Sequence, residues 1–252
     1  MNESEQAIPF IFLRRFSRND KDLYQAYREL KYEVFVAEQG WHSLADESVA
    51  CVAREDEFDA HGRFWMASTG ETAPVGIVRG SLLKEGFPHR ELFEHHLRQP
   101  HVAVMFASLC TINGLAVRTS YRRSIYRAQE WGWTGTIGKL LLLAIMRDLE
   151  GEGMEAAVAT AGGLISARLC ESLGFIAIDL PQRTGLHPEL FMINIGLVFG
   201  LPLHVRAQEE CGIRHGGEVR VSAQAARLLG YFKDRRVTLL GARPMADILG
   251  SA

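Results

Sequence analysis

The most reactive group of side chains in the sequence is a run of carboxylates, Asp56, Glu57 and Asp59. Carboxylates this close together raise one another's pKa, and they can hold an ammonium group or take its proton. Such a group suits a reaction in which an amine loses a proton before it attacks a carbonyl carbon. A solvated acidic loop explains the same residues without any chemistry. Asp56, Asp59 and His61 could also bind a metal, but no fourth ligand stands out, and we expect no metal site.

Arg79 is the second candidate, because it lies in the middle of the apolar run Gly76-Ile-Val-Arg-Gly. A buried arginine needs an anionic partner. Asp56 or Asp59 would make it part of the fold, whereas a substrate carboxylate would make it part of a binding site. The guanidinium fork suits either partner.

A third feature is the segment Gly135-Thr-Ile-Gly-Lys139, which opens an apolar helix and follows the predicted strand residues Leu115, Ala116 and Val117. The first N–H groups of a helix have no intrahelical partner and carry positive partial charge, so they form a natural phosphate site. Glycine lets the backbone approach a phosphate closely. The two glycines could equally be ordinary loop residues.

Three histidines are weaker candidates. His101 begins a predicted strand and is a possible base, although a strand-end position on the surface fits it better. His95 and His96 are expected to be in solvent.

Two motifs resemble the GNAT acyltransferase superfamily. The first is Gly-x-x-Gly-Lys-Leu-Leu from Gly135, after Val117-Arg-x-x-Tyr-Arg-Arg, and the second is the helix ending in Leu-Gly-Phe175. The resemblance implies an α/β fold in which two central strands splay apart around the pantetheine arm of an acyl thioester. It implies that the backbone of Leu115, Ala116 and Val117 faces the pantetheine and that Gly135, Thr136, Ile137, Gly138 and Lys139 hold phosphate. Cys170 stands where many acetyl-transferring members carry a tyrosine acid.

The N-terminal half is similar to the acyl-homoserine lactone (autoinducer) synthases and the long-chain N-acyl amino acid synthases. The shared landmarks are Lys31-Tyr-Glu-Val-Phe35, Trp41, the Asp56-x-x-Asp59 pair and Arg79. The resemblance implies that Lys31, Phe35 and Trp41 line a substrate pocket and that Asp56, Asp59 and Arg79 shape the acceptor site. The sequence differs at Lys31, where these families carry arginine. It also has Thr111-Ile-Asn-Gly114 where autoinducer synthases carry Glu-x-Ser-Arg, which argues against a homoserine-lactone product.

About a dozen residues, 124 to 135, are inserted before the helix. The stretch from Tyr121 to Trp133 holds four aromatic residues and three arginines but only one acid. We predict that it folds over the cleft, with Trp131 and Trp133 packed toward it, or that it faces an acidic partner. Acyl carrier protein is acidic, so candidate docking residues are Arg122, Arg123 and Arg127.

Hydrophobic periodicity predicts the elements that position these residues. Strands are expected at 9–16, 63–69, 75–83, 101–118, 156–160, 175–180 and 190–197, and helices at 20–39, 138–149 and 164–172, with a short helix between 85 and 100. We therefore predict an α/β fold of the GNAT type, with a mixed, mostly antiparallel sheet flanked by helices. Residues 1–200 form the acyltransferase-like domain, and 201–252 form a C-terminal extension packed on it.

Composition limits the class of protein. The 252 residues are 47% hydrophobic and 23% charged, with a net charge of −2, which is typical of a globular protein and argues against a nucleic-acid binder. Four scattered cysteines predict reduced, mostly buried thiols. No apolar run is long enough to span a membrane. We expect a cytoplasmic protein.

These observations together predict an N-acyltransferase. It would move an acyl group from an acyl thioester, on acyl carrier protein or CoA, to the amine of an amino acid or similar small molecule. No tightly bound cofactor is expected. Two alternatives stay open: an acetyl-CoA-dependent acetyltransferase of a small amine or lysine, and a non-catalytic thioester-binding protein.

Overall fold

The computed structural model describes residues 8–70, 74–86, 88, 90–104, 106–161, 164–173, 175–178, 195–200 and 227. The described strands form one sheet in the order β6-β5-β1-β2-β3-β4-β7-β9-β8. Neighbours pair antiparallel, apart from β1 with β5 and β4 with β7. The strands are β1 (Phe10–Phe16), β2 (Arg63–Ser68), β3 (Pro74–Leu82), β4 (Leu109–Val117), β5 (Tyr126–Ala128), β6 (Thr134–Gly135), β7 (Ala156–Ala161), β8 (Ile176–Ile178) and β9 (Ile195–Gly200). The mixed, mostly antiparallel sheet predicted from the sequence is confirmed.

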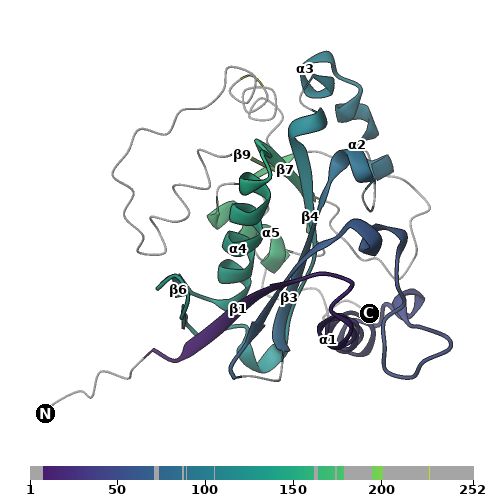
Figure 1. The fold of residues 1–252 in the computed structure, drawn as a ribbon. Coiled ribbons are helices and arrows are strands. Elements are labelled where there is room, and N and C mark those ends of the chain that lie inside the picture. The colour runs from purple at the N-terminus through teal and green to yellow at the C-terminus, as the bar shows by residue number, and fades with distance from the viewer. Residues whose placement is uncertain are drawn as a thin grey trace, which may run out of the picture.

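Helix α1 (Lys21–Lys31) covers one face of this sheet, as Figure 1 shows. Its stripe of Tyr24, Tyr27 and Leu30 follows helical spacing and is buried. The ring of Tyr27 meets that of Phe64 of β2 edge to face, with 4.8 Å between centroids. A π-helical segment, Tyr32–Glu38, continues α1 directly.

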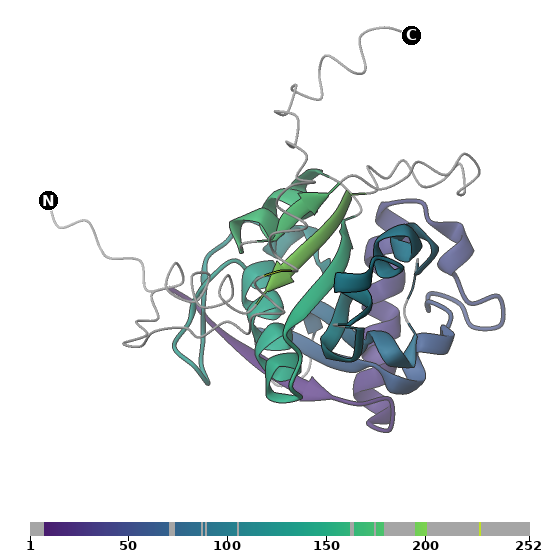
Figure 2. The same ribbon diagram turned by 90° about the horizontal axis from the view of Figure 1, so that it is seen from above.

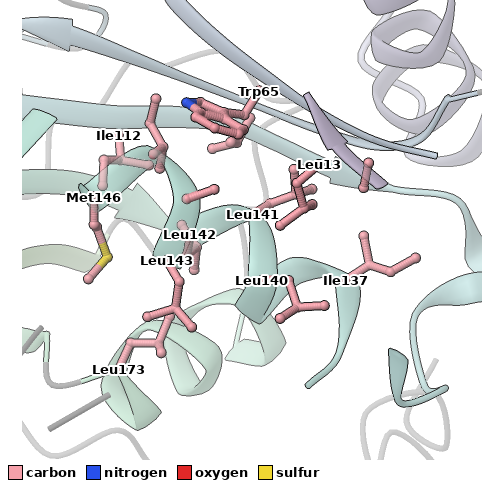
Figure 3. Packing of buried hydrophobic residues seen from close by; sticks show 14 of the residues in the cluster. Leu13, Trp65, Ile112, Ile137, Leu140, Leu141, Leu142, Leu143, Met146 and Leu173 are labelled. Atoms are coloured by element: carbon pink, nitrogen blue, oxygen red, sulfur yellow. The ribbon is translucent and has the colours of Figure 1, made fainter. Parts of the chain in front are cut away.

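Helix α4 (Ile137–Gly151) lies on the opposite face, so the sheet is sandwiched between α1 and α4 (Figure 2). Its leucines pack beneath Trp65 and the strands around it (Figure 3). Two glycines of β3 permit this close approach. A Cβ on Gly76 would come within 2.7 Å of the Ile137 side chain, and one on Gly80 within 2.9 Å of Leu149. Any larger residue at these two positions would push α4 away from the sheet.

The remaining helices are α2 (Arg90–Leu97), α3 (Pro100–Ala103) and α5 (Leu164–Ser172). The prediction of a strand from His101 is wrong for its first residues. The chain forms α3 there, and β4 begins only at Leu109. Pro100 explains the difference, since proline at the first helical position has the backbone angle that a helix needs.

The segment from Tyr121 to Gly135 corrects a second prediction. It forms β5 and β6, which lengthen the sheet beside β1, rather than a cover over a cleft. Trp133 is buried in the core on the α4 side and packs against Trp131. Beyond the β1–β5 pairing, the carboxylate of Glu130 accepts a hydrogen bond from the backbone N–H of Leu13, at 3.1 Å.

The C-terminal extension predicted at 201–252 lies outside the described residues, apart from Arg227. In the described part of the chain, no helix combines the length and apolar character that crossing a bilayer requires.

Candidate active site

Strand β4 changes its pairing in the middle of the sheet. It pairs with β7 only through Leu109–Ile112, and beyond that point the two strands no longer pair. Its register with β3 shifts there as well, because Arg79 lies opposite Asn113 while Ile77 lies opposite Ala116. This is a β-bulge, and Gly114 within it has a φ of +64°, a conformation that glycine adopts without strain.

The bulge opens an otherwise buried strand. Residues 109–112 and 116–117 of β4 are buried, whereas 113–115 are partly exposed. Bulges often redirect side chains next to active sites. The splay of two central strands, predicted at this place from the sequence, is therefore present.

Arg79 is the centre of the polar cluster beside the bulge. Its side chain is 3% exposed. Its Nη1 donates to Asp56, at 2.6 Å, and to Asp59, and its Nε donates to Asn113 Oδ1 at 2.6 Å. The sequence left open whether its partner is an aspartate or a substrate. Both aspartates are bound to it.

The two aspartates have different surroundings. Asp59 is 1% exposed, and its Oδ2 accepts from the hydroxyl of Tyr24 at 2.8 Å and from the backbone N–H of Asp56 at 3.2 Å. Asp56 caps the short 3-10 helix Glu57–His61 by accepting from the Phe58 N–H at 3.0 Å, but its side chain is 31% exposed. Both oxygens of Asp59 are thus occupied by the fold, and Asp56 is the carboxylate that reaches solvent.

Burial acts to raise the pKa of Asp56, but the positive charges of Arg79 and Lys31 outweigh it and hold that pKa below its ordinary value. Lys31, on the last turn of α1, places its Nζ 3.4 Å from Asp56 Oδ2. Burial lowers the pKa of Lys31, against the opposing effect of the Asp59 charge. The cluster contains two carboxylates and two basic groups, so its charges balance when Lys31 is protonated.

Phe35 and Trp41 stack on each other, with ring centroids 5.0 Å apart. They belong to the apolar cluster beneath α1, where Phe35 is buried and Trp41 is partly exposed. The π-helical segment that carries Phe35 is held by the loop after β4. Arg118 pairs with Glu33 at 3.1 Å, and Arg122 pairs with Glu38.

The predicted phosphate site lies on the other side of the sheet, where Thr136 caps the N-terminus of α4. The Thr136 hydroxyl accepts from the N–H of Lys139 at 3.4 Å. Gly138 packs against α5, because a Cβ there would come within 2.9 Å of Leu169 and 3.9 Å of Leu115. The start of α4 therefore lies next to Leu115, in the opened part of β4. Ala116 and Val117 follow Leu115 and end the strand. Gly135, on β6, and Ile137 flank Thr136.

The predicted docking arginines differ in their availability. Arg122 also donates to the backbone carbonyl of Val117, at 2.7 Å, so it is engaged by the fold. Arg123 and Arg127 are exposed. The register of β5 with β1 places Arg127 opposite Phe10, itself an exposed aromatic residue.

The histidines and cysteines have different surroundings. His96 is buried, not solvated as expected, and His101 lies in α3. Cys51 is exposed, whereas Cys110 and Cys170 are buried free thiols, and burial raises the pKa of Cys170 to about 12. A thiol with that pKa stays protonated and is a poor nucleophile. The described residues contain no group of three or more metal-ligating side chains.

An open pocket of about 1090 Å³ lies where α1 begins, near the end of β1. Its walls carry four arginines, and each is paired with a carboxylate: Arg15 with Asp148, Arg18 with Glu55, Arg28 with Asp46 and Arg63 with Glu85. These pairs neutralise the four arginines, and we assign the pocket no ligand.

Three residues of the cluster were not among the predicted site residues: Tyr24, Tyr27 and Asn113. The two tyrosines share with Lys31 the helical spacing of the α1 stripe, which indicates a core face and not a polar site. One signal did point to Asn113: it lies in the segment Thr111-Ile-Asn-Gly114, where the sequence differs from the autoinducer-synthase pattern.

No protein-family model matches the sequence, and no curated protein matches it. Solved structures do. The chain is similar to the CoA-dependent acyl-homoserine lactone synthase BjaI, with a TM-score of 0.58 at 16% identity over 87% of this chain and 99% of that one. It is similar to FeeM, an N-acyl amino acid synthase from uncultured soil microbes, with a TM-score of 0.52 at 12% identity, over 82% and 99% of the two chains. For TofI the TM-score is 0.53 at 14% identity, over 79% and 96%.

These similarities are similarities of fold. They confirm the fold that was predicted from the sequence. They also confirm that this fold resembles the fold of autoinducer synthases and N-acyl amino acid synthases.

Proposed function

We propose that the protein is an N-acyltransferase that moves an acyl group from a thioester, carried by acyl carrier protein or CoA, to the amine of an amino acid or similar small molecule. One observation carries this proposal. The opened part of β4 separates two sites of complementary chemistry: the Arg79 cluster on the α1 side and the N-terminus of α4 on the other.

On the donor side, the backbone of Leu115, Ala116 and Val117 faces the pantetheine arm. The N–H groups from Thr136 to Lys139 hold phosphate, because the first turn of a helix carries positive partial charge. Within this turn the Lys139 N–H also donates to the Thr136 hydroxyl. Gly135 and Gly138 flank this turn. Gly138 also allows α5 to pack closely.

On the acceptor side, Asp56 receives the ammonium group, since its carboxylate is the partly exposed one. Arg79 and Asp59 hold Asp56 in place, and Phe35 and Trp41 line the pocket beyond Lys31. Lys31 is the base best suited to this site: it contacts the exposed carboxylate, and its pKa is lowered by burial.

The reaction then balances as follows. Lys31, in its neutral form, takes a proton from the ammonium, and the amine lone pair attacks the thioester carbonyl carbon. The C–N bond forms and the C–S bond breaks. The leaving thiolate takes the proton held by Lys31, so free thiol is released. The second amine proton goes to solvent, which leaves the acyl amide.

Thiol release tests the proposal. Acetyl-, octanoyl- and palmitoyl-thioesters of CoA and of acyl carrier protein are each incubated with a panel of amino acids and amines. Release that depends on an amine, with an acylated amine in the products, supports the proposal. Turnover confined to acetyl-CoA indicates an acetyltransferase instead. Thioester binding without any thiol release indicates a non-catalytic binding protein.

A further inference from the structure

Two buried polar atoms beside the cluster have no hydrogen-bond partner in the described structure. They are the hydroxyl of Tyr27 and the side-chain amide nitrogen of Asn113. A buried polar group without a partner costs about 1–3 kcal/mol. A ligand that supplies the missing acceptor atoms would satisfy both groups.

The orientation of the Asn113 amide follows from its neighbour. A guanidinium group has only donors, so the Asn113 atom that meets Arg79 Nε at 2.6 Å must be the carbonyl oxygen. The NH₂ group then points away from Arg79. It presents two donors that nothing in the described structure accepts.

Gly114 leaves space beside the Tyr27 hydroxyl. A Cβ at this position would lie 3.5 Å from the Tyr27 hydroxyl and 3.9 Å from Arg79 Cβ. The bulge also makes residues 113–115 the partly exposed part of β4. A small group entering through the opened strand would therefore come next to the Tyr27 hydroxyl.

The chemistry of the two groups selects an anionic oxygen. Burial raises the pKa of Tyr27, so its phenol stays protonated and can donate. The Asn113 NH₂ group only donates. An ammonium group would find no acceptor there at Asn113, whereas a carboxylate would accept from both residues. Hydrogen bonds to a charged group are also the stronger ones.

Arg79 relates this space to the acceptor carboxylate described above. Its Nη1 contacts Asp56 and its Nε contacts Asn113. One end of the guanidinium therefore faces the site assigned to the ammonium, and the other end faces Asn113. An amino-acid zwitterion, which carries its amine and its carboxylate on the same carbon atom, matches that arrangement.

We propose that Tyr27 and Asn113 bind the carboxylate of the acceptor, and so select an amino acid over an amine that lacks this group. The inference rests on the proposed N-acyl transfer, and it adds two specificity-determining residues to that site.

The test compares Tyr27→Phe and Asn113→Asp with the unchanged protein. Asn113→Asp keeps an oxygen for Arg79 but removes the NH₂ donors. The acceptors are L-leucine and L-phenylalanine, each paired with its decarboxylated amine, isoamylamine and phenethylamine. We expect each variant to raise KM for the amino acids at least tenfold more than KM for the amines. Ser81→Ala is the matched control: Ser81 Oγ is also buried without a partner, and the proposal gives it no role.

A stability measurement separates this role from a structural one. The Tyr27 hydroxyl has no partner to lose in the free protein, so Tyr27→Phe should unfold at the same or a higher denaturant concentration. A clear loss of stability in Tyr27→Phe would show a structural role and overturn the proposal. Unchanged amino-acid KM values would overturn it too. Equal losses of kcat with amino acids and amines would also overturn it, since the two residues would then act on the thioester oxygen.

The carboxylate site can also be tested if no acyl transfer is found. Calorimetric titration of the free protein with L-leucine and with isoamylamine measures binding alone. A preference for L-leucine that both variants abolish supports the carboxylate site even when the proposed activity fails. The absence of any such preference contradicts it.

Discussion

Tyr24 on α1 donates a hydrogen bond of 2.8 Å to Asp59, which lies 35 positions further along the chain. This bond ties the helix to the short 3-10 turn that carries both aspartates. With the Arg79 pairing, it leaves Asp59 with no oxygen for a substrate. The sequence predicted that Asp56 and Asp59 act together on an acceptor amine, and the geometry divides their roles.

Asp59→Asn should therefore be a folding variant. Removing one partner of a buried ion pair leaves the other charge uncompensated, which costs about 3–5 kcal/mol. Denaturant unfolding measures the loss directly. Asp56→Asn should cost less stability but more turnover, because Asp56 is the exposed partner. Equal stability losses in the two variants would contradict this division.

Acid should reveal the charge of Asp56. Its folded pKa lies below the unfolded value of 3.8, so its stabilising contribution is fully present above that value. The contribution is lost as pH falls through the folded pKa. The difference in unfolding free energy between the unchanged protein and Asp56→Asn should thus be constant near neutral pH and shrink below pH 3.8. If this difference grows on acidification, the pKa of Asp56 is raised by folding and not lowered.

Lys31 should set the pH dependence of turnover. The charged groups that face it are Asp56, Asp59 and Arg79, and burial among them lowers its pKa below the ordinary 10.5. The rate should rise with pH through that lowered pKa, since only the neutral amine accepts a proton. Lys31→Arg keeps a positive charge beside Asp56 but cannot lose its proton, so its rate should be low and lack this rise. A rising limb that survives in Lys31→Arg belongs to another group.

The start of α4 offers a test of donor binding that preserves the fold. Gly138 is unsuitable, because any side chain there meets Leu169. Thr136→Asp keeps a good N-cap residue but places a negative charge where phosphate should bind. Thioester affinity should fall more than tenfold, about 1.4 kcal/mol. Thr136→Ser is the neutral control and should bind normally. If a folded Thr136→Asp variant binds the thioester normally, the phosphate does not bind at the start of α4.

Docking of acyl carrier protein should depend on Arg123 and Arg127 and not on Arg122, which the fold already uses. Changing Arg123 and Arg127 together to Glu should slow reaction with acyl carrier protein and weaken its salt dependence, because exposed charges mainly speed encounter. Reaction with acyl-CoA should change much less. Equal losses with both donors would place the two arginines at a CoA phosphate, and no loss with either would make them solvent residues.

The sequence predicted most elements because their periodicity is local. The α1 stripe, the glycine-bearing start of α4 and the apolar run of β2 are all visible within a dozen residues. The bulge in β4 is not, because it depends on which residue of β3 lies opposite Asn113. The roles of Tyr24 and Asp59 were hidden for the same reason: their hydrogen bond joins segments whose distance in space no local pattern records.

Two predictions failed where a local signal was weighted wrongly. The β-branched run after His101 outweighed Pro100, although that proline starts a helix. The aromatic segment from Tyr121 to Trp133 indicated a cover over the site because tryptophans are rare in solvated loops. The same tryptophans are explained by burial against α4 and Trp65.

The short strands β5 and β6 also bear on how the protein behaves at high concentration. An unpaired strand edge is a template on which further chains can add. Here β5 pairs with the first residues of β1, and the Glu130 carboxylate occupies the next free N–H, that of Leu13. Among the described strands, the sheet then ends at β6, which is only two residues long. This edge thus offers a second molecule little backbone to pair with and a negative charge to avoid, which protects the protein against edge-to-edge aggregation.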